Sequence, residues 1–120
     1  MAEFKIETRP GQNPGARIVR ITGPLTLQTL FDFQRALRDE LAAVTIVDLS
    51  AVPYLDSAAL GSLLGLHVSC ERHGRRYGLA QVPQRLKDIF QVTHVDKILV
   101  CFPTVEEAEK SLEAFVATGN

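Results

Sequence analysis

The sequence predicts an α/β fold: a mixed, mostly parallel sheet of about five strands that starts with an antiparallel hairpin and is flanked by about four helices. After two strand patterns at the start, segments with helical periodicity alternate with short apolar, β-branched runs. Such alternation requires right-handed crossovers and a largely parallel sheet. The 120 residues, 46% of them hydrophobic, suffice for the core of a single domain over residues 1–120 without disulfides or metals.

The first half of the chain carries the hairpin, one helix and one buried strand. Residues 4–8 alternate apolar and polar side chains, residues 10–16 have the composition of a turn, and residues 17–22 form a second strand pattern. Residues 45–49 (TIVDL) are short and mostly apolar, which is typical of a strand covered on both faces. Between them, LFDFQRALRDELA is predicted to be an amphipathic helix, because apolar residues recur at helical spacing: Leu30, Phe33, Leu37 and Leu41.

The second half is predicted to hold three helices and two strands. The helices cover residues 57–73, 83–92 and 104–117, and the strands cover residues 77–80 and 98–102. Gly61 and Gly65 lie one turn apart in the first of these helices. Since each costs roughly 1 kcal/mol of helix propensity, we expect close contact with the sheet to offset the cost. The apolar face of the same helix comprises Leu60, Leu63, Leu64, His67 and Cys70.

Composition excludes several classes of protein. The net charge of -1 argues against a nucleic-acid partner, because phosphate binding needs an excess of Lys and Arg. No apolar run is long enough for a membrane span, and the N-terminus lacks the apolar core of a signal peptide. Cys70 and Cys101 have no paired spacing, so we expect buried free thiols, a cytoplasmic location, and neither a metal nor a cofactor.

The residue pattern does not predict an enzyme. Ser57 could serve as a nucleophile, with His67, His73 or His94 as its base. The sequence has neither a GxSxG elbow nor a glycine-rich phosphate loop, however. His67 would also lie about 15 Å from Ser57 along the axis of their shared helix, which is too far for proton transfer. We therefore expect the three histidines to be packing or surface residues.

Asp56 and Ser57 stand side by side where a strand pattern gives way to the helix of residues 57–73. Asp and Ser are both favoured N-cap residues, so spacing alone favours a capping role for one of the two.

The segments around this junction resemble the signature of STAS domains, and in particular of stand-alone bacterial anti-sigma-factor antagonists. The matching residues are Asp48-Leu49-Ser50, Val52, Leu55-Asp56-Ser57 and Leu60-Gly61. The resemblance implies that Ser57 is phosphorylated by an anti-sigma factor that is also a serine kinase, and that this partner, not this chain, binds ATP and Mg²⁺. It also implies a partner-binding surface made of Asp56, Ser57, Ala58, Ala59, Gly61 and Thr26.

Two further roles stay open for the same fold. The domain could be a non-switching scaffold or accessory subunit, in a signalling assembly or in lipid transport, or it could sense a small molecule or nucleotide. The chain differs from the family pattern at Thr26, where the family usually has Asp, and at Ala58-Ala59, where it usually has Ser or Thr and then Gly. We expect a monomer or a weak dimer.

Overall fold

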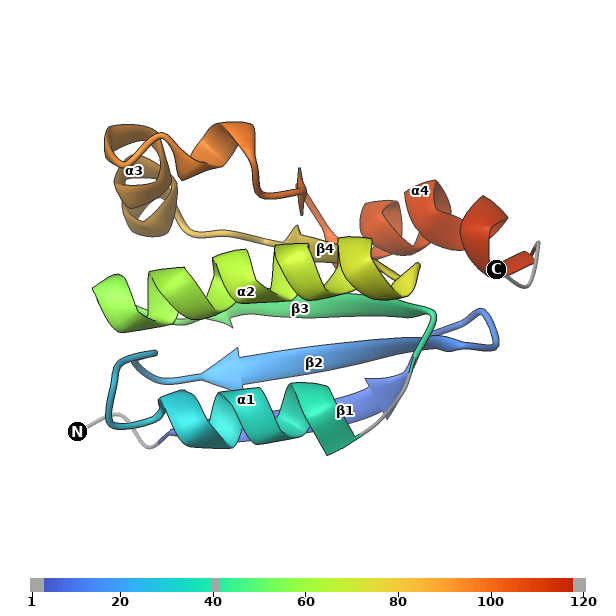
Figure 1. The fold of residues 1–120 in the computed structure, drawn as a ribbon, viewed down its shortest axis with the longest axis horizontal. Coiled ribbons are helices and arrows are strands. Elements are labelled where there is room, and N and C mark those ends of the chain that lie inside the picture. Colours follow the sequence, from blue (N-terminus) through green and yellow to red (C-terminus); the bar gives the residue numbers. More distant parts are fainter. Residues whose placement is uncertain (1–3, 40–41, 118–120) are drawn as a thin grey trace.

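Strands and helices follow one another along the chain in the predicted order (Figure 1). The computed structural model of the protein describes residues 4–39 and 42–117. Its elements are β1 (Lys5–Pro10), β2 (Ala16–Thr22), α1 (Leu30–Asp39), β3 (Val44–Ala51), α2 (Ser57–His73), β4 (Arg76–Ala80), α3 (Gln84–Val92), the 3-10 helix η1 (Val95–Lys97), β5 (Cys101–Phe102) and α4 (Val105–Ala117).

The sheet has the strand order β1-β2-β3-β4-β5. β1 and β2 form the predicted antiparallel hairpin, in which Lys5 lies opposite Thr22, and every later pair is parallel. Because successive parallel strands are neighbours and the crossovers are right-handed, the helices that connect them must all lie on one face. The packing agrees: α1, α2 and α3 share one core with the sheet, whereas α4 packs against β3 and β4 in another.

Alternate residues of the central strands therefore enter two separate cores. On β3, Val47 and Leu49 belong to the larger core under the connecting helices, and Val44 and Ile46 belong to the smaller core under α4. This confirms the prediction that residues 45–49 are covered on both faces. The fold thus places the start of α2 at the carboxyl end of β3, where a functional surface can form.

The last strand is shorter than predicted. Residues 98–102 were expected to be extended, but β5 comprises only Cys101 and Phe102. The N–H groups of Ile98 and Leu99 both donate to the carbonyl of Val95, which curls this part of the chain into η1 and the turn after it. Cys101, in β5, is exposed, contrary to the expectation of a buried thiol, whereas Cys70 is buried as predicted.

Gly61 and Gly65 of α2 do not make the close contact with the sheet that the sequence predicted. A Cβ atom built at Gly61 or Gly65 would meet nothing within 4 Å, so the expected close contact with the sheet is wrong. A close contact is found instead at Gly78 in β4, where a Cβ atom would lie 2.7 Å from Cε2 of Phe102. Leu41, the last residue of the apolar stripe predicted around α1, lies outside the described residues.

Candidate functional site

Asp56, and not Ser57, is the N-cap of α2. Asp56 has an extended backbone, with φ at -101°, and its Oδ1 accepts a hydrogen bond of 3.0 Å from the N–H of Ala59. Ser57 is the first residue of the helix. The structure thereby decides between the two caps that the sequence allowed, and it leaves the Ser57 hydroxyl without a capping role.

The carboxylate of Asp56 also ties α2 to the loop between β2 and α1. Its Oδ2 accepts a hydrogen bond of 3.0 Å from the N–H of Leu27. The backbone of Asp56 donates to the carbonyl of Leu25 over 3.2 Å, and the N–H of Leu25 donates to the carbonyl of Tyr54 over 3.1 Å. Asp56 therefore connects, through hydrogen bonds, two segments that lie about thirty residues apart in the sequence.

These hydrogen bonds keep Asp56 ionised. The N–H of Ala59, and after it the N–H of Leu27, stabilise the carboxylate and lower the pKa of Asp56 below its ordinary value. A negative charge thus lies directly beside Ser57 at neutral pH.

The Ser57 side chain is exposed, and among the described residues its hydroxyl has no hydrogen-bond partner. It lies in the first turn of α2, where the helix dipole presents its positive end. A hydroxyl at such a place is accessible to a modifying enzyme, and a negative group attached to it is favoured by the helix dipole.

The other predicted partner-binding residues are exposed to different degrees. Gly61 is exposed and Ala58 is half-buried, but Ala59 is completely buried in the larger core, so its side chain is not available at the surface. Thr26 is half-buried next to Leu27, and its N–H donates to the Thr29 hydroxyl over 3.0 Å. The Thr26 side chain thus belongs to the loop that Asp56 holds in place.

Sequence reasoning missed three large apolar side chains that are exposed at this end of the molecule. Leu27 is 60% exposed, Phe31 66% and Tyr54 46%. Phe31 follows Leu30, the first residue of the apolar stripe of α1, and lies out of phase with that stripe, which was the signal available in the sequence. We call Leu27, Phe31, Tyr54, Asp56 and Ser57 together the Ser57 surface; Figure 1 shows its elements at the same end of the sheet.

The histidines have other partners. The ring of His67 is held between the Tyr77 hydroxyl, 2.7 Å from Nδ1, and the carboxylate of Glu71, 2.7 Å from Nε2. The Nδ1 atom of His73 lies 2.9 Å from the carbonyl of Ser69, and His94 is exposed in the turn before η1. Residues 4–39 and 42–117 hold no group of three side chains placed to bind a metal ion.

The DLS segment has a structural role at the end of β3. Asp48 is buried, and its Oδ1 accepts a hydrogen bond of 2.9 Å from the N–H of Ser50. This local bond lies within β3, where the register of its pairing with β2 shifts. Within the described part of the chain, no helix is both long and apolar enough to cross a membrane.

Comparison with known proteins places this fold in a family. Among solved structures, it resembles a candidate anti-sigma factor antagonist from Thermotoga maritima, with a TM-score of 0.78, 20% identity and coverage of 94% of this chain and 95% of the other. A sulfate transporter family protein from Wolinella succinogenes is similar with a TM-score of 0.76 and 23% identity, over 87% of this chain and 89% of the other. The phosphorylated form of the Bacillus cell fate determinant SpoIIAA is similar with a TM-score of 0.61 and 19% identity, over 92% of this chain and 99% of the other. These identities establish likeness of fold alone. A model of the STAS domain family matches residues 7–108, and the chain therefore belongs to the STAS family.

Proposed function

We propose that this protein is an anti-sigma-factor antagonist that binds an anti-sigma factor with serine kinase activity, and that phosphorylation of Ser57 releases it. The supporting observation is that Ser57 is exposed at a helix N-terminus, next to Asp56, which binds the N–H of Leu27, and that Leu27, Phe31 and Tyr54 are also exposed at this end of the sheet. Solved structures of similar fold include a candidate anti-sigma factor antagonist and the Bacillus cell fate determinant SpoIIAA in its phosphorylated form. In this proposal the chain is a binding module and a kinase substrate, not an enzyme.

The fold can accept a phosphate at Ser57. Phosphorylation adds about -1.5 to -2 charges at neutral pH. The Ser57 side chain is exposed and makes no hydrogen bond within the described chain that the phosphate would break. The helix dipole favours the added charge by roughly 0.3–1 kcal/mol, and the nearby Asp56 carboxylate opposes it. We expect these opposing effects to leave the stability of the domain almost unchanged.

Phosphorylation of Ser57 would change the affinity of a partner docked on the Ser57 surface much more than it changes the stability of the domain. Burying an exposed Phe or Leu side chain contributes roughly 1.5–3 kcal/mol to binding, and the Ser57 surface offers two of these, Leu27 and Phe31, as well as Tyr54. Removing a charged group from water costs several kcal/mol unless the partner supplies compensating contacts. A phosphate buried at such an interface therefore offsets most of the apolar gain, which corresponds to a loss of affinity of about 100-fold or more.

The partner would supply the nucleotide and the metal ion for phosphorylation. The kinase would bind ATP and Mg²⁺, and binding of the unphosphorylated antagonist would release a sigma factor in the cytoplasm. We propose that the antagonist acts as a monomer or weak dimer.

The test is phosphorylation followed by binding. The protein is incubated with its cognate anti-sigma factor, ATP and Mg²⁺, and the phosphate is located by mass spectrometry. Calorimetry then compares the wild type with Ser57→Asp, and with Ser69→Asp as a matched control that places the same charge further along α2. We expect the phosphate on Ser57 and a loss of affinity for Ser57→Asp only. Phosphate elsewhere, or equal affinities for the two variants, would refute the switch.

A non-switching scaffold or accessory subunit is the second candidate. Two observations favour it: Thr26 carries no acidic group beside the switch, and a sulfate transporter family protein has a similar fold. In this case Ser57 is only the first residue of α2, and partner binding is the same for the wild type and Ser57→Asp. A gene for a histidine-kinase-like ATPase beside a sigma-factor gene would support the switch, and transporter genes would support the scaffold.

A further inference from the structure

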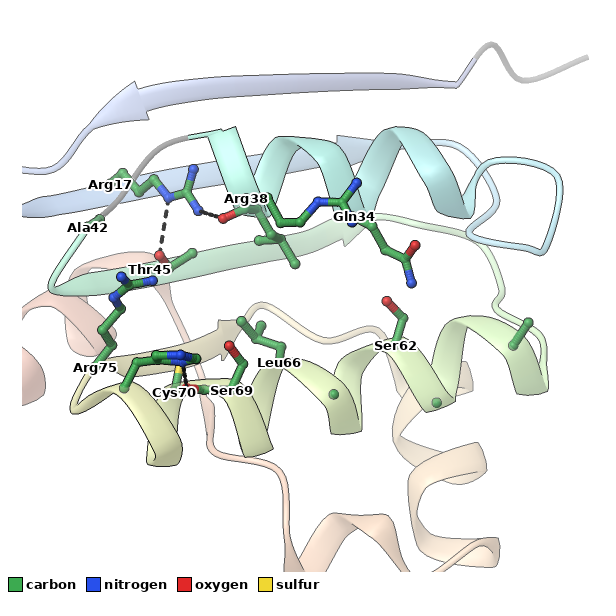
Figure 2. Close-up of a pocket in the computed structure, with 15 residues that line it drawn as sticks. Arg17, Gln34, Arg38, Ala42, Thr45, Ser62, Leu66, Ser69, Cys70 and Arg75 are labelled. Carbon is green, nitrogen blue, oxygen red and sulfur yellow. Dashed lines mark hydrogen bonds between the residues drawn. The ribbon is translucent and has the colours of Figure 1, made fainter.

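A groove of about 700 Å³ lies between α1 and α2 (Figure 2). Its lining on α2 runs from Ala58 in the first turn to His73 in the last, which is about 22 Å of helix. Pockets for small molecules typically measure roughly 300–1,000 Å³. The groove therefore has the volume of a ligand site and an elongated shape.

The two glycines of α2 keep one wall of this groove open. Gly61 and Gly65 both line it, and neither would gain a contact within 4 Å from an added Cβ atom. Glycine is unfavourable inside a helix, and no close packing offsets that cost here. Larger side chains at these positions would project into free space, so their absence leaves room for an elongated ligand.

Positive charge gathers along the groove. Arg38 of α1 lines it with its guanidinium directed toward Gln34, and Arg75, just after α2, lines its other end. The guanidinium of Arg17 forms part of the wall, where it donates to the carbonyls of Ala36 and Leu37 over 2.8 and 2.7 Å. Figure 2 shows Arg17 and Arg75 at one end and Ser62 toward the other. None of the described residues that line the groove is acidic.

The remaining lining residues indicate the chemistry of the ligand. Aliphatic side chains from both helices, including Leu37 and Leu66, lie along the groove together with Ala58. No Phe, Tyr or Trp is among the described lining residues, so a nucleobase would find no aromatic ring of these types on which to stack. An alkyl chain needs no such ring, because burial of apolar surface is sufficient to hold it.

We propose that the α1–α2 groove binds a single-chain amphiphile with an anionic head group. The carboxylate or phosphate head lies at Arg75, at the end of the groove that Arg17 also lines, where the Arg75 guanidinium can donate paired hydrogen bonds to it. The alkyl chain runs along the open wall at Gly65 and Gly61 toward Ala58. The groove contains none of the five residues of the Ser57 surface, although Ala58 and Gly61 were predicted to bind the partner, and its ligand does not depend on the switch proposed above.

Binding of laurate and dodecyl phosphate, below their micelle concentrations, tests the proposal by calorimetry on the full chain. Both probes are expected to bind, whereas acetate and ATP are not. Arg75→Gln should weaken binding about tenfold, since it removes a charge-assisted hydrogen bond to the head group. Arg35→Gln is the matched control: it changes the same charge on exposed α1 surface outside the groove. Equal affinities for Arg75→Gln and Arg35→Gln would overturn the proposed position of the head group.

The position of the chain is tested at Gly65. Gly65→Leu fills the open wall with a residue that favours helix, so the variant is expected to fold, as checked by circular dichroism and thermal unfolding. It should abolish laurate binding, whereas Gly65→Ala should retain most of it. Unchanged binding by Gly65→Leu, or binding of laurate no tighter than that of acetate to the wild type, would show that the groove does not hold an alkyl chain.

Discussion

Three glycines in helix and strand are expected to respond in opposite ways to substitution by alanine. Gly61 and Gly65 lie in an exposed helix interior, where a Cβ atom meets nothing within 4 Å. Alanine is more favourable than glycine there by about 0.8–1 kcal/mol, so each substitution should stabilise the protein by that amount. At Gly78 the new Cβ atom would lie 2.7 and 2.8 Å from two ring atoms of Phe102 and 3.6 Å from Cδ1 of Leu112. The ring must then move against α4, which costs about 1–2 kcal/mol.

Urea unfolding followed by circular dichroism measures these differences in the free energy of unfolding. For a chain of this length, a change of 1 kcal/mol corresponds to about 4 °C in the melting temperature. Gly61→Ala and Gly65→Ala should therefore raise the melting temperature by about 3–4 °C each, and Gly78→Ala should lower it by about 4–8 °C.

Alanine at Gly61 or Gly65 is expected to raise the free energy of unfolding and alanine at Gly78 to lower it, so one change of the wrong sign refutes the reasoning. If Gly65→Ala destabilised the protein, α2 would have to approach a neighbouring element closely at this position, and the open wall of the α1–α2 groove would not exist. If Gly78→Ala were neutral, the contact between β4 and the Phe102 ring would be looser than the structure shows. Either result would contradict the helix and sheet spacing described above.

Three further predictions concern polar groups that the fold holds in place. The pKa of Asp56 is lowered, so the stability that its carboxylate contributes is complete above about pH 4 and is lost as the pH falls through the pKa of Asp56 in the folded protein. Asp56→Asn should therefore reduce the difference between the urea midpoints measured at pH 7 and pH 3. Burial raises the pKa of Tyr77 to about 12, so its contribution is complete below about pH 10 and is lost as the pH rises toward 12. Alkaline absorbance titration should show this late ionisation in the wild type and not in Tyr77→Phe. Arg17→Lys should cost about 2 kcal/mol in urea unfolding, because an ammonium cannot reproduce the forked bonds to Ala36 and Leu37; a neutral result would show that these bonds do not hold the end of α1.

Local patterns predicted most of the elements correctly because their causes act within a few residues. The helix of residues 57–73 begins beside a favoured cap, and it ends at Gly74, whose φ of 66° suits glycine. The capping bond from the N–H of Glu107 to the Thr104 hydroxyl, 3.0 Å long, starts α4 in the same way. Residues 98–100 were mispredicted because an apolar run of this length suits a strand as well as a turn that, as here, buries only Leu99.

The candidate site was predicted in part. Ser57 and Asp56 were found from their place in the sequence, but the bond from Leu27 to the Asp56 carboxylate joins residues 29 positions apart, and no local pattern encodes it. Exposed Leu27 and Tyr54 were missed for the same reason: their exposure depends on which neighbours the folded chain brings against them.

The order of the strands and helices, the two-sided burial of β3, the junction at Asp56–Ser57 and the resemblance to the STAS family are all contained in the linear sequence. They depend on periodicity, capping chemistry and short motifs, which each segment carries by itself. Only the tertiary structure decided that Asp56 and not Ser57 caps α2, that Gly78 and not Gly61 or Gly65 is in close contact, and that a groove separates α1 from α2. Those features depend on the distance between elements, which is determined by packing among residues far apart in the chain.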